Sequence, residues 1–526
     1  MKRYLILMSV FLLAQLFAYS QKKGLSAISR ESLKSYMEFF SSDQLRGREM
    51  GTVANEIASL YIKTNIQRMG LKPDVDDYFQ HNPLTLVKNS PEGSYLNLKD
   101  NSGRQIFSTD SIMQLMPLSE TLETEGEIVF AGFGYEDEAG EYSDLRDIDL
   151  KDKVVLLMTR TPELAGSGRK DISFSFATEE EKIGRLLKKG VKAFLYVFDP
   201  GLDEQDPFKT IYYQYSSQEQ VISDGSGALN LPLVFGFIRP AVADSLLSSS
   251  GRTLKDLYDQ ILTTGKPASF NITGRSIAIR TAVSSHRTDG RNVIGIIEGS
   301  DPVLKKECVV YTAHFDHVGT DSRGEIYNGA DDDASGSMAM LELANAFMKL
   351  KKKPLRSIVF VWVNGEEKGL IGSGYYVKNP AMPLDKTLLD INLDMIGRSV
   401  TPADTGTFFG FDIDVTKKGE VMMYSKHEST ELDKIIKKAA SRTGMSIRDM
   451  GADIEAGGSD HESFWDKGVT AIMFHTGVHA DTHQLTDDVD RIDFEKMEQV
   501  TKLVFLTGYE VANRKERIQL NKKLSE

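Results

Sequence analysis

The chain has 526 residues, with 63 Lys and Arg against 76 Asp and Glu, and its formal net charge is −13. Hydrophobic residues make up 40% and charged residues 26%, which excludes a disordered, collagen-like or multi-span membrane chain. The acidic balance argues against nucleic acid as a partner, because phosphate contacts need a basic face. The single cysteine, Cys308, excludes an intrachain disulfide. At this length we expect two or three packed units.

The first 20 residues have the pattern of a secretory signal peptide. Lys2 and Arg3 make a basic start, an apolar run covers residues 4–17, and residues 18–20 have the small-x-small form of a cleavage site. The apolar run is shorter than the roughly 20 residues of a spanning helix, so cleavage is favoured over a retained anchor. We therefore expect an exported protein, periplasmic or secreted, with no stable membrane insertion after cleavage.

The next two segments differ in their predicted secondary structure. Residues 21–120 are predicted to form an N-terminal helical lead-in, since residues 29–73 carry apolar side chains at helical spacing around a polar loop at 45–51. Residues 121–285 hold short β-type runs and one amphipathic helix at 179–189. We interpret this second segment as a small β-rich insert domain.

Residues 286–515 alternate strands, loops and helices. The expected strands are 308–313, 358–363, 388–393 and 471–474, and the clearest helix is 338–350. This alternation predicts a three-layer α/β domain with a mixed, mostly parallel central sheet, on which the lead-in packs. Residues 516–526 are predicted to be a charged tail.

Metal-competent side chains follow the expected strands. They are His314, Asp316 and His317 after the first, Glu366 and Glu367 after the second, Asp394 after the third, and His475, His479 and His483 after the fourth. Ligands bind beyond the carboxyl ends of parallel strands, so these side chains should converge on one cleft. Asp331, Asp332 and Asp333 precede a helix, and three adjacent acids repel one another unless a cation neutralises them. Singly, each residue could be a helix cap or a solvated side chain. Together they offer the imidazole and carboxylate ligands of a zinc site, and a shared carboxylate would suit two metals.

Five motifs occur in an order that resembles the co-catalytic di-zinc aminopeptidases of peptidase family M28. They are AHFDH (313–317), GADDDASG (329–336), NGEEKGL (364–370), NLDMIGR (392–398) and THQLTD (482–487). The lead-in is similar to that of the family, and the insert resembles a protease-associated (PA) domain. The resemblance implies the zinc-exopeptidase fold, two zinc ions, and hydrolysis at the N-termini of peptides or proteins.

The resemblance also implies a role for each matching residue. Asp332 would bridge the two zinc ions, with His314 and Asp394 on one and Glu367 and His483 on the other. Glu366 would be the general base that takes a proton from a metal-bridging water. Asp316 would orient His314, Asp333 would support the ligands from behind, and the peptide bond between Asp332 and Asp333 would be cis.

The sequence leaves open the last metal ligand, the residues that line the cleft and the exact function. His475 and His479 rival His483 as the last ligand, and Thr482 stands where some family members have a tyrosine. The candidates for lining the cleft are His317, Asp460, His461, His479 and Thr482. The alternative functions are an M28 carboxypeptidase, a glutaminyl cyclase-like acyltransferase with one zinc, and a metal-binding protein without turnover. The sequence predicts neither the residue preference nor the oligomeric state.

Overall fold

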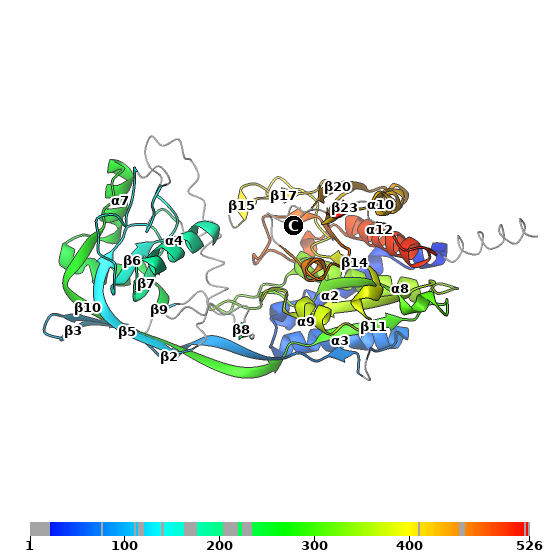
Figure 1. Cartoon of the computed structure of the whole chain (residues 1–526), viewed down its shortest axis with the longest axis horizontal. Coiled ribbons are helices and arrows are strands. Elements are labelled where there is room, and N and C mark those ends of the chain that lie inside the picture. Colours follow the sequence, from blue (N-terminus) through cyan, green and yellow to red (C-terminus); the bar gives the residue numbers. More distant parts are fainter. Residues whose placement is uncertain are drawn as a thin grey trace, which may run out of the picture.

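The computed structural model describes most of the chain. The described residues are 21–74, 77–109, 112–113, 120–137, 141–162, 176–202, 219–222, 234–408, 411–451, 458–519 and 522–523. The predicted signal peptide, residues 1–20, lies outside them. No helix within the described ranges has the length and apolar character that crossing a membrane requires. Figure 1 shows a large body and a smaller lobe, connected by two long strands.

The large body is built on an eight-stranded mixed sheet. Its order is β1 (Phe79–Gln80), β11 (Asn292–Ile297), β13 (Ser357–Val363), β12 (Cys308–His314), β14 (Thr387–Leu393), β21 (Ala471–His475), β18 (Glu420–Ser425) and β20 (Ser446–Gly451). The central strands β13, β12, β14 and β21 run parallel to one another. All of their residues are buried, which explains their almost continuously apolar sequences. The four strands predicted in this region, and the mixed sheet, are confirmed.

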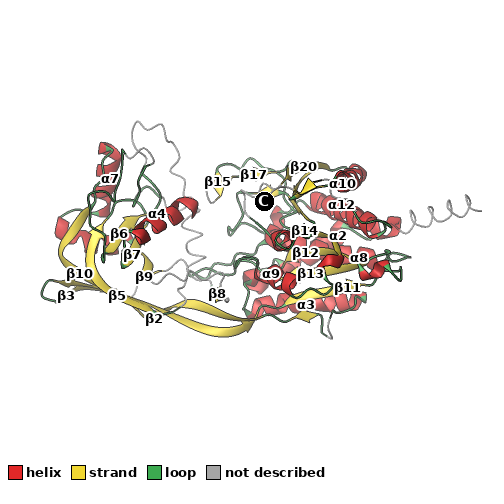
Figure 2. Cartoon of the chain, in the orientation of Figure 1, coloured by secondary structure: helices red, strands yellow, loops and turns green. Residues whose placement is uncertain are grey.

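Helices cover both faces of this sheet, as Figure 2 shows. One face packs against α2 (Arg30–Phe40), α3 (Val53–Met69), α8 (Gly336–Met348), α10 (Thr430–Thr443) and α12 (Phe494–Ala512). The other face packs against α9 (Ile371–Lys378) and α11 (His461–Trp465). Neighbouring residues of β12 divide between the two cores, with Val309 in the first and Val310 in the second. The predicted three-layer architecture is therefore confirmed.

The N-terminal helices form where the sequence places their caps. The Thr52 side chain accepts a hydrogen bond from the Asn55 main chain at the start of α3, and Gly70 ends this helix in the left-handed region at φ 88°. Between α2 and α3 lies a short 3₁₀ segment, η1 (Asp43–Arg48), which covers part of the expected polar loop.

The smaller lobe is an α/β unit. Its sheet has the order β3 (Gln105–Thr109), β2 (Pro83–Asp100), β10 (Phe270–Asp289), β5 (Leu122–Phe130), β6 (Val154–Met158), β7 (Ala193–Val197), β9 (Val234–Ile238) and β4 (Ile112–Met113), and β8 (Gln220–Ile222) pairs with β2. Its helices are α4 (Phe176–Lys188), α6 (Pro240–Leu247) and α7 (Leu254–Thr264). The strands expected in the insert are present, and its described residues also form α6 and α7, which the sequence did not predict.

The long strands β2 and β10 pair antiparallel from Pro83 with Asp289 to Asp100 with Arg275 and connect the lobe to the body (Figure 1). β2 falls within residues 21–120, where the sequence predicts a helical lead-in, but its pairing assigns it to the sheet of the lobe. In the sequence of β2, the alternation of apolar residues is interrupted by a polar stretch around Pro91 and Gly93, and such a stretch is typical of a loop.

The remaining elements are short. The strands are β15 (Thr407–Phe408), β16 (Phe411–Asp412), β17 (Asp414–Val415), β19 (His427–Glu428), β22 (Gly477–Val478) and β23 (Lys522–Lys523). The helical turns are η2 (Ser248–Ser250), η3 (Leu304–Lys306), η4 (Ala330–Ser335), η5 (Leu384–Lys386) and η6 (Val489–Arg491). β23 pairs with β19, so the expected charged tail includes a short strand.

Candidate active site

Three of the predicted ligands lie at the carboxyl ends of neighbouring strands in the sheet. His314 is the last residue of β12, and Asp394 directly follows β14. Glu367 follows β13 after a short turn that contains Gly365, whose φ is 81°. Since these strands are parallel neighbours, their carboxyl ends meet. Asp332 joins them from η4, the turn that precedes α8.

A first group of donor atoms forms around His314. Its Nε2 lies 3.2 Å from Oδ1 of Asp332 and 3.7 Å from Oδ1 of Asp394. All three residues are buried. Oδ1 of Asp394 has no hydrogen-bond partner among the described residues, although it is shielded from solvent. A buried carboxylate oxygen without a donor is the kind of atom that a cation satisfies.

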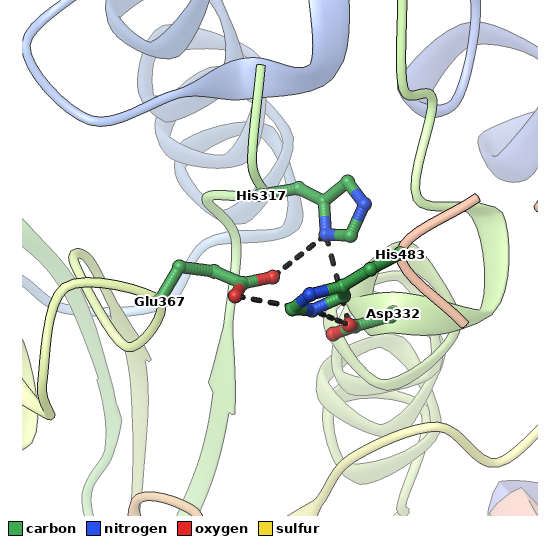
Figure 3. A group of neighbouring side chains, drawn as sticks. All are labelled: His317, Asp332, Glu367 and His483. Carbon is green, nitrogen blue, oxygen red and sulfur yellow. Dashed lines mark hydrogen bonds and ion pairs between the residues drawn. The ribbon is translucent and has the colours of Figure 1, made fainter. Parts of the chain in front are cut away.

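A second group, drawn in Figure 3, forms around the other carboxylate oxygen of Asp332. Nε2 of His483 lies 3.0 Å from Oδ2 of Asp332 and 3.2 Å from Oε2 of Glu367. Asp332 therefore presents Oδ1 to the first group and Oδ2 to the second. This is the arrangement of a carboxylate that bridges two metal ions.

The donor distances fit zinc. Four ligands at about 2.0–2.1 Å from a tetrahedral zinc ion are about 3.3–3.4 Å from one another. The separations of His314 and His483 from the carboxylate oxygens around them run from 3.0 to 3.7 Å. Imidazole and carboxylate are also the donors that zinc takes. The structure thus brings together all five residues predicted as ligands, in two groups that can each accept an ion.

Glu366 lies beside these groups without belonging to either. Its Oε2 is 4.0 Å from Nε2 of His314. Burial raises the pKa of the Glu366 carboxyl well above its ordinary value, and the neighbouring carboxylates of Glu367, Asp460 and Asp394 add to the shift. A carboxyl group in this position can accept and return a proton.

Asp316 and Asp333 hold the loops that carry the ligands. Oδ1 of Asp316 accepts a hydrogen bond from the Glu366 main chain at 3.3 Å. Nδ1 of His314 lies 3.3 Å from the main-chain oxygen of Asp316 but 3.8 Å from its carboxylate. The carboxylate of Asp316 therefore fixes the Glu366 loop and also faces His314, whose Nδ1 lies closer to the main-chain oxygen of Asp316. Oδ1 of Asp333 accepts from the main chains of Gly336 and Met395.

The backbone at the site has unusual conformations. The peptide bond between Asp332 and Asp333 is cis, as the resemblance implied. Met395, next to Asp394, and His483 itself lie in the left-handed region, at φ 51° and 52°. Such non-glycine conformations persist where the surrounding structure enforces them, often at functional sites.

The rival histidines lie outside the donor groups. Nδ1 of His475 accepts a hydrogen bond from the Gly477 main chain. Nε2 of His479 lies 3.2 Å from Oδ2 of Asp331, in a buried network behind the site. The Thr482 hydroxyl accepts from the His479 main chain at 3.1 Å, so it stabilises the turn before His483. Of His475, His479 and His483, only His483 meets Asp332 and Glu367.

The other cleft candidates differ in their surroundings. Asp460 is buried near Glu366 and Asp394, and burial raises the pKa of its carboxyl to about 7. His461 is fully buried, with its ring 4.3 Å from that of Trp465. His317 lies in the second group, with Nδ1 at 2.8 Å from Oε1 of Glu367.

Arg48 supports the site and was missed as a functional residue. Its fully buried side chain donates to the main-chain oxygens of Phe40, Phe315, Asn328 and Gly329. Two of these acceptors precede Asp332, and one lies between His314 and His317. The polar loop at 45–51 was the only sequence feature that pointed to this region, and it does not indicate what the Arg48 side chain contacts.

Replacing Arg48 by methionine is expected to lower the free energy of unfolding of the large body by roughly 3–5 kcal/mol, because buried carbonyls lose their donor. Calorimetry should show this as a lower melting temperature of that unit. Arg46→Met is the matched control, since Arg46 is exposed in the same turn and its loss should cost less than about 0.5 kcal/mol. Equal melting temperatures for the two variants would contradict the role of Arg48.

Comparisons with known proteins relate the chain to peptidases. Residues 292–507 match Peptidase family M28. The aminopeptidase YwaD of Bacillus subtilis is 29% identical over 242 residues, which are 44% of this chain and 47% of the relative. Leupeptin-inactivating enzyme 1 of Streptomyces exfoliatus is 36% identical over 144 residues, 27% of this chain and 30% of the relative. The chain thus spans less than half of the length of these curated relatives.

Solved structures match over almost the whole chain. An aminopeptidase from Aneurinibacillus sp. strain AM-1 has a TM-score of 0.57 at 21% identity, covering 95% of this chain and 97% of its own. A peptidase M28 precursor from Shewanella amazonensis has a TM-score of 0.55 at 17% identity, covering 97% and 100%. At these identities the likeness shows the fold. The chain therefore contains a domain of peptidase family M28, over residues 292–507.

Proposed function

We propose that this protein is an exported zinc-dependent aminopeptidase, which hydrolyses the N-terminal bond of peptides or proteins. The observation that carries the proposal is the position of Glu366. It lies partly exposed beside two donor groups that share Asp332, and it is a member of neither. A carboxyl group that lies next to metal ligands without being a ligand itself is well placed to act as a general base.

When bound, two zinc ions would polarise the scissile carbonyl and make a water molecule more acidic. His314 and Asp394 would hold one ion and Glu367 and His483 the other, with Asp332 shared. Glu366 takes a proton from the attacking water and passes it to the leaving amine, so the base of the first step becomes the acid of the second. Asp316 keeps this carboxyl in place through the main chain of Glu366.

Substrate direction and location belong to the same proposal. YwaD and the Aneurinibacillus protein are both named as aminopeptidases, and this supports peptide N-termini as substrates. Export is supported by the basic and apolar pattern of residues 1–20.

The glutaminyl cyclase alternative is weakened by the first donor group. A single-zinc enzyme has no need for both His314 and Asp394 beside an otherwise complete second group. The carboxypeptidase alternative would use the same donors, and substrate tests separate it from the proposal.

The test is a panel of small substrates incubated with the zinc-loaded chain. The panel holds an aminoacyl p-nitroanilide, its N-acetylated counterpart, an N-blocked dipeptide and a peptide with N-terminal glutamine. The proposal expects release of nitroaniline only where the amine is free. Cleavage of the N-blocked dipeptide would indicate a carboxypeptidase instead, and ammonia release without hydrolysis would indicate a cyclase.

A further inference from the structure

The second donor group contains a fourth side chain. His317 is fully buried, with Nδ1 at 2.8 Å from Oε1 of Glu367 and 3.7 Å from Oδ2 of Asp332. These distances lie on either side of the separation of about 3.3–3.4 Å between neighbouring ligands of tetrahedral zinc. Figure 3 shows the imidazole on the same side of Asp332 as Glu367 and His483. We infer that His317 is a fourth protein ligand to the ion held by Asp332, Glu367 and His483. The inference rests on the proposed two-metal function.

The fold fixes the ring of His317 in this position. Gly329 packs against it so closely that a Cβ there would lie 2.3 Å from Cδ2 of the imidazole. The ring of His483 lies 5.4 Å away at an interplanar angle of 77°. Only a residue without a side chain at position 329 leaves room for the imidazole, so the position of the His317 ring depends on Gly329.

The nitrogen that faces the group is Nδ1. Nε2 is buried and has no hydrogen-bond partner among the described residues. A ligand role requires a lone pair on Nδ1 and the proton on Nε2, whereas simple support of Glu367 requires the proton on Nδ1. The two roles therefore differ in whether the imidazole coordinates the ion, which can be measured.

A fourth protein ligand makes the two metal positions unequal. The position with His317 would have four protein donors, and the position at His314 and Asp394 would have three. The three-donor position keeps room for substrate or water, and it is the one beside Glu366. The general base thus lies next to the open position, which is where a proton must be moved.

The test is metal binding by His317→Ala and His317→Asn, the second being the more conservative change in a buried site. Zinc affinities are measured by competition with a chelator, and cobalt(II) absorption spectra report the coordination. We expect one class of zinc site to weaken by about 100-fold or more, beyond most losses seen on removing a supporting group. The cobalt spectrum of that class should also change. His461→Ala is the matched control, because His461 is equally buried but belongs to neither donor group, and it should retain both classes.

Two results would overturn the inference. One is unchanged zinc affinity in either folded His317 variant. The other is a weaker affinity with the cobalt spectrum of the unmodified protein, which would make His317 a support of Glu367 only. If the unmodified chain itself binds no metal, the proposed function fails instead, so the two failures are distinguishable.

Discussion

Replacing Glu366 by glutamine is expected to lower kcat by about 10³–10⁴-fold while the chain keeps its metal. Glutamine has nearly the same shape but cannot accept the proton of the attacking water. Since Glu366 belongs to neither donor group, the variant should bind zinc as the unmodified protein does. The measurement is kcat on a free-amino substrate together with the zinc content of the same preparation.

The control for this change is Glu342→Gln. Glu342 is a buried carboxylate on α8 that accepts hydrogen bonds from Ser29 and Ser32, outside the site. Its variant should keep kcat within about twofold, because no reacting group depends on it. Full activity of Glu366→Gln would remove Glu366 from the mechanism, and loss of zinc in that variant would make it a ligand.

Asp332→Ala is expected to abolish both zinc sites and hence all measurable activity. The two oxygens of this carboxylate serve different groups, Oδ1 facing His314 and Oδ2 facing His483. Zinc content should fall from about two ions per chain to none after dialysis. The melting temperature should then no longer rise on addition of zinc, because stabilisation by a ligand requires binding to the folded state.

Asp331→Asn separates this effect from general damage to the turn. Asp331 is equally buried and adjacent, but its carboxylate accepts from the Gly397 main chain and faces His479. This variant should retain both ions, although the fold loses stability. One retained ion in Asp332→Ala would show that the groups do not share this residue.

The sequence predicted the centre of the sheet well because β12, β13 and β14 are buried on both faces. Their nearly continuous apolar sequences leave no other location for them. The convergence of His314, Glu367 and Asp394 then follows from parallel neighbours ending at one edge. The resemblance to a known family supplied the rest of the ligand set.

Other features depend on tertiary contacts that the sequence does not reveal. β2 is long only because β10 pairs with it, across a polar stretch that alone resembles a loop. His317 comes close to Glu367 because Gly329 leaves space for its ring. Arg48 acts on main-chain oxygens, which have no signature in the sequence. Local patterns cannot predict any of these three, since each partner lies far away along the chain.

The proposed active site holds a pair of metal ions that share Asp332, with Glu366 beside them. Its most direct measurement is the anomalous difference map of a zinc-loaded crystal, collected at the zinc edge. We expect two peaks about 3.5–4 Å apart on either side of the Asp332 carboxylate. One peak should lie by His314 and Asp394, and the other by Glu367, His483 and His317. A single peak, or peaks away from Asp332, would contradict the account.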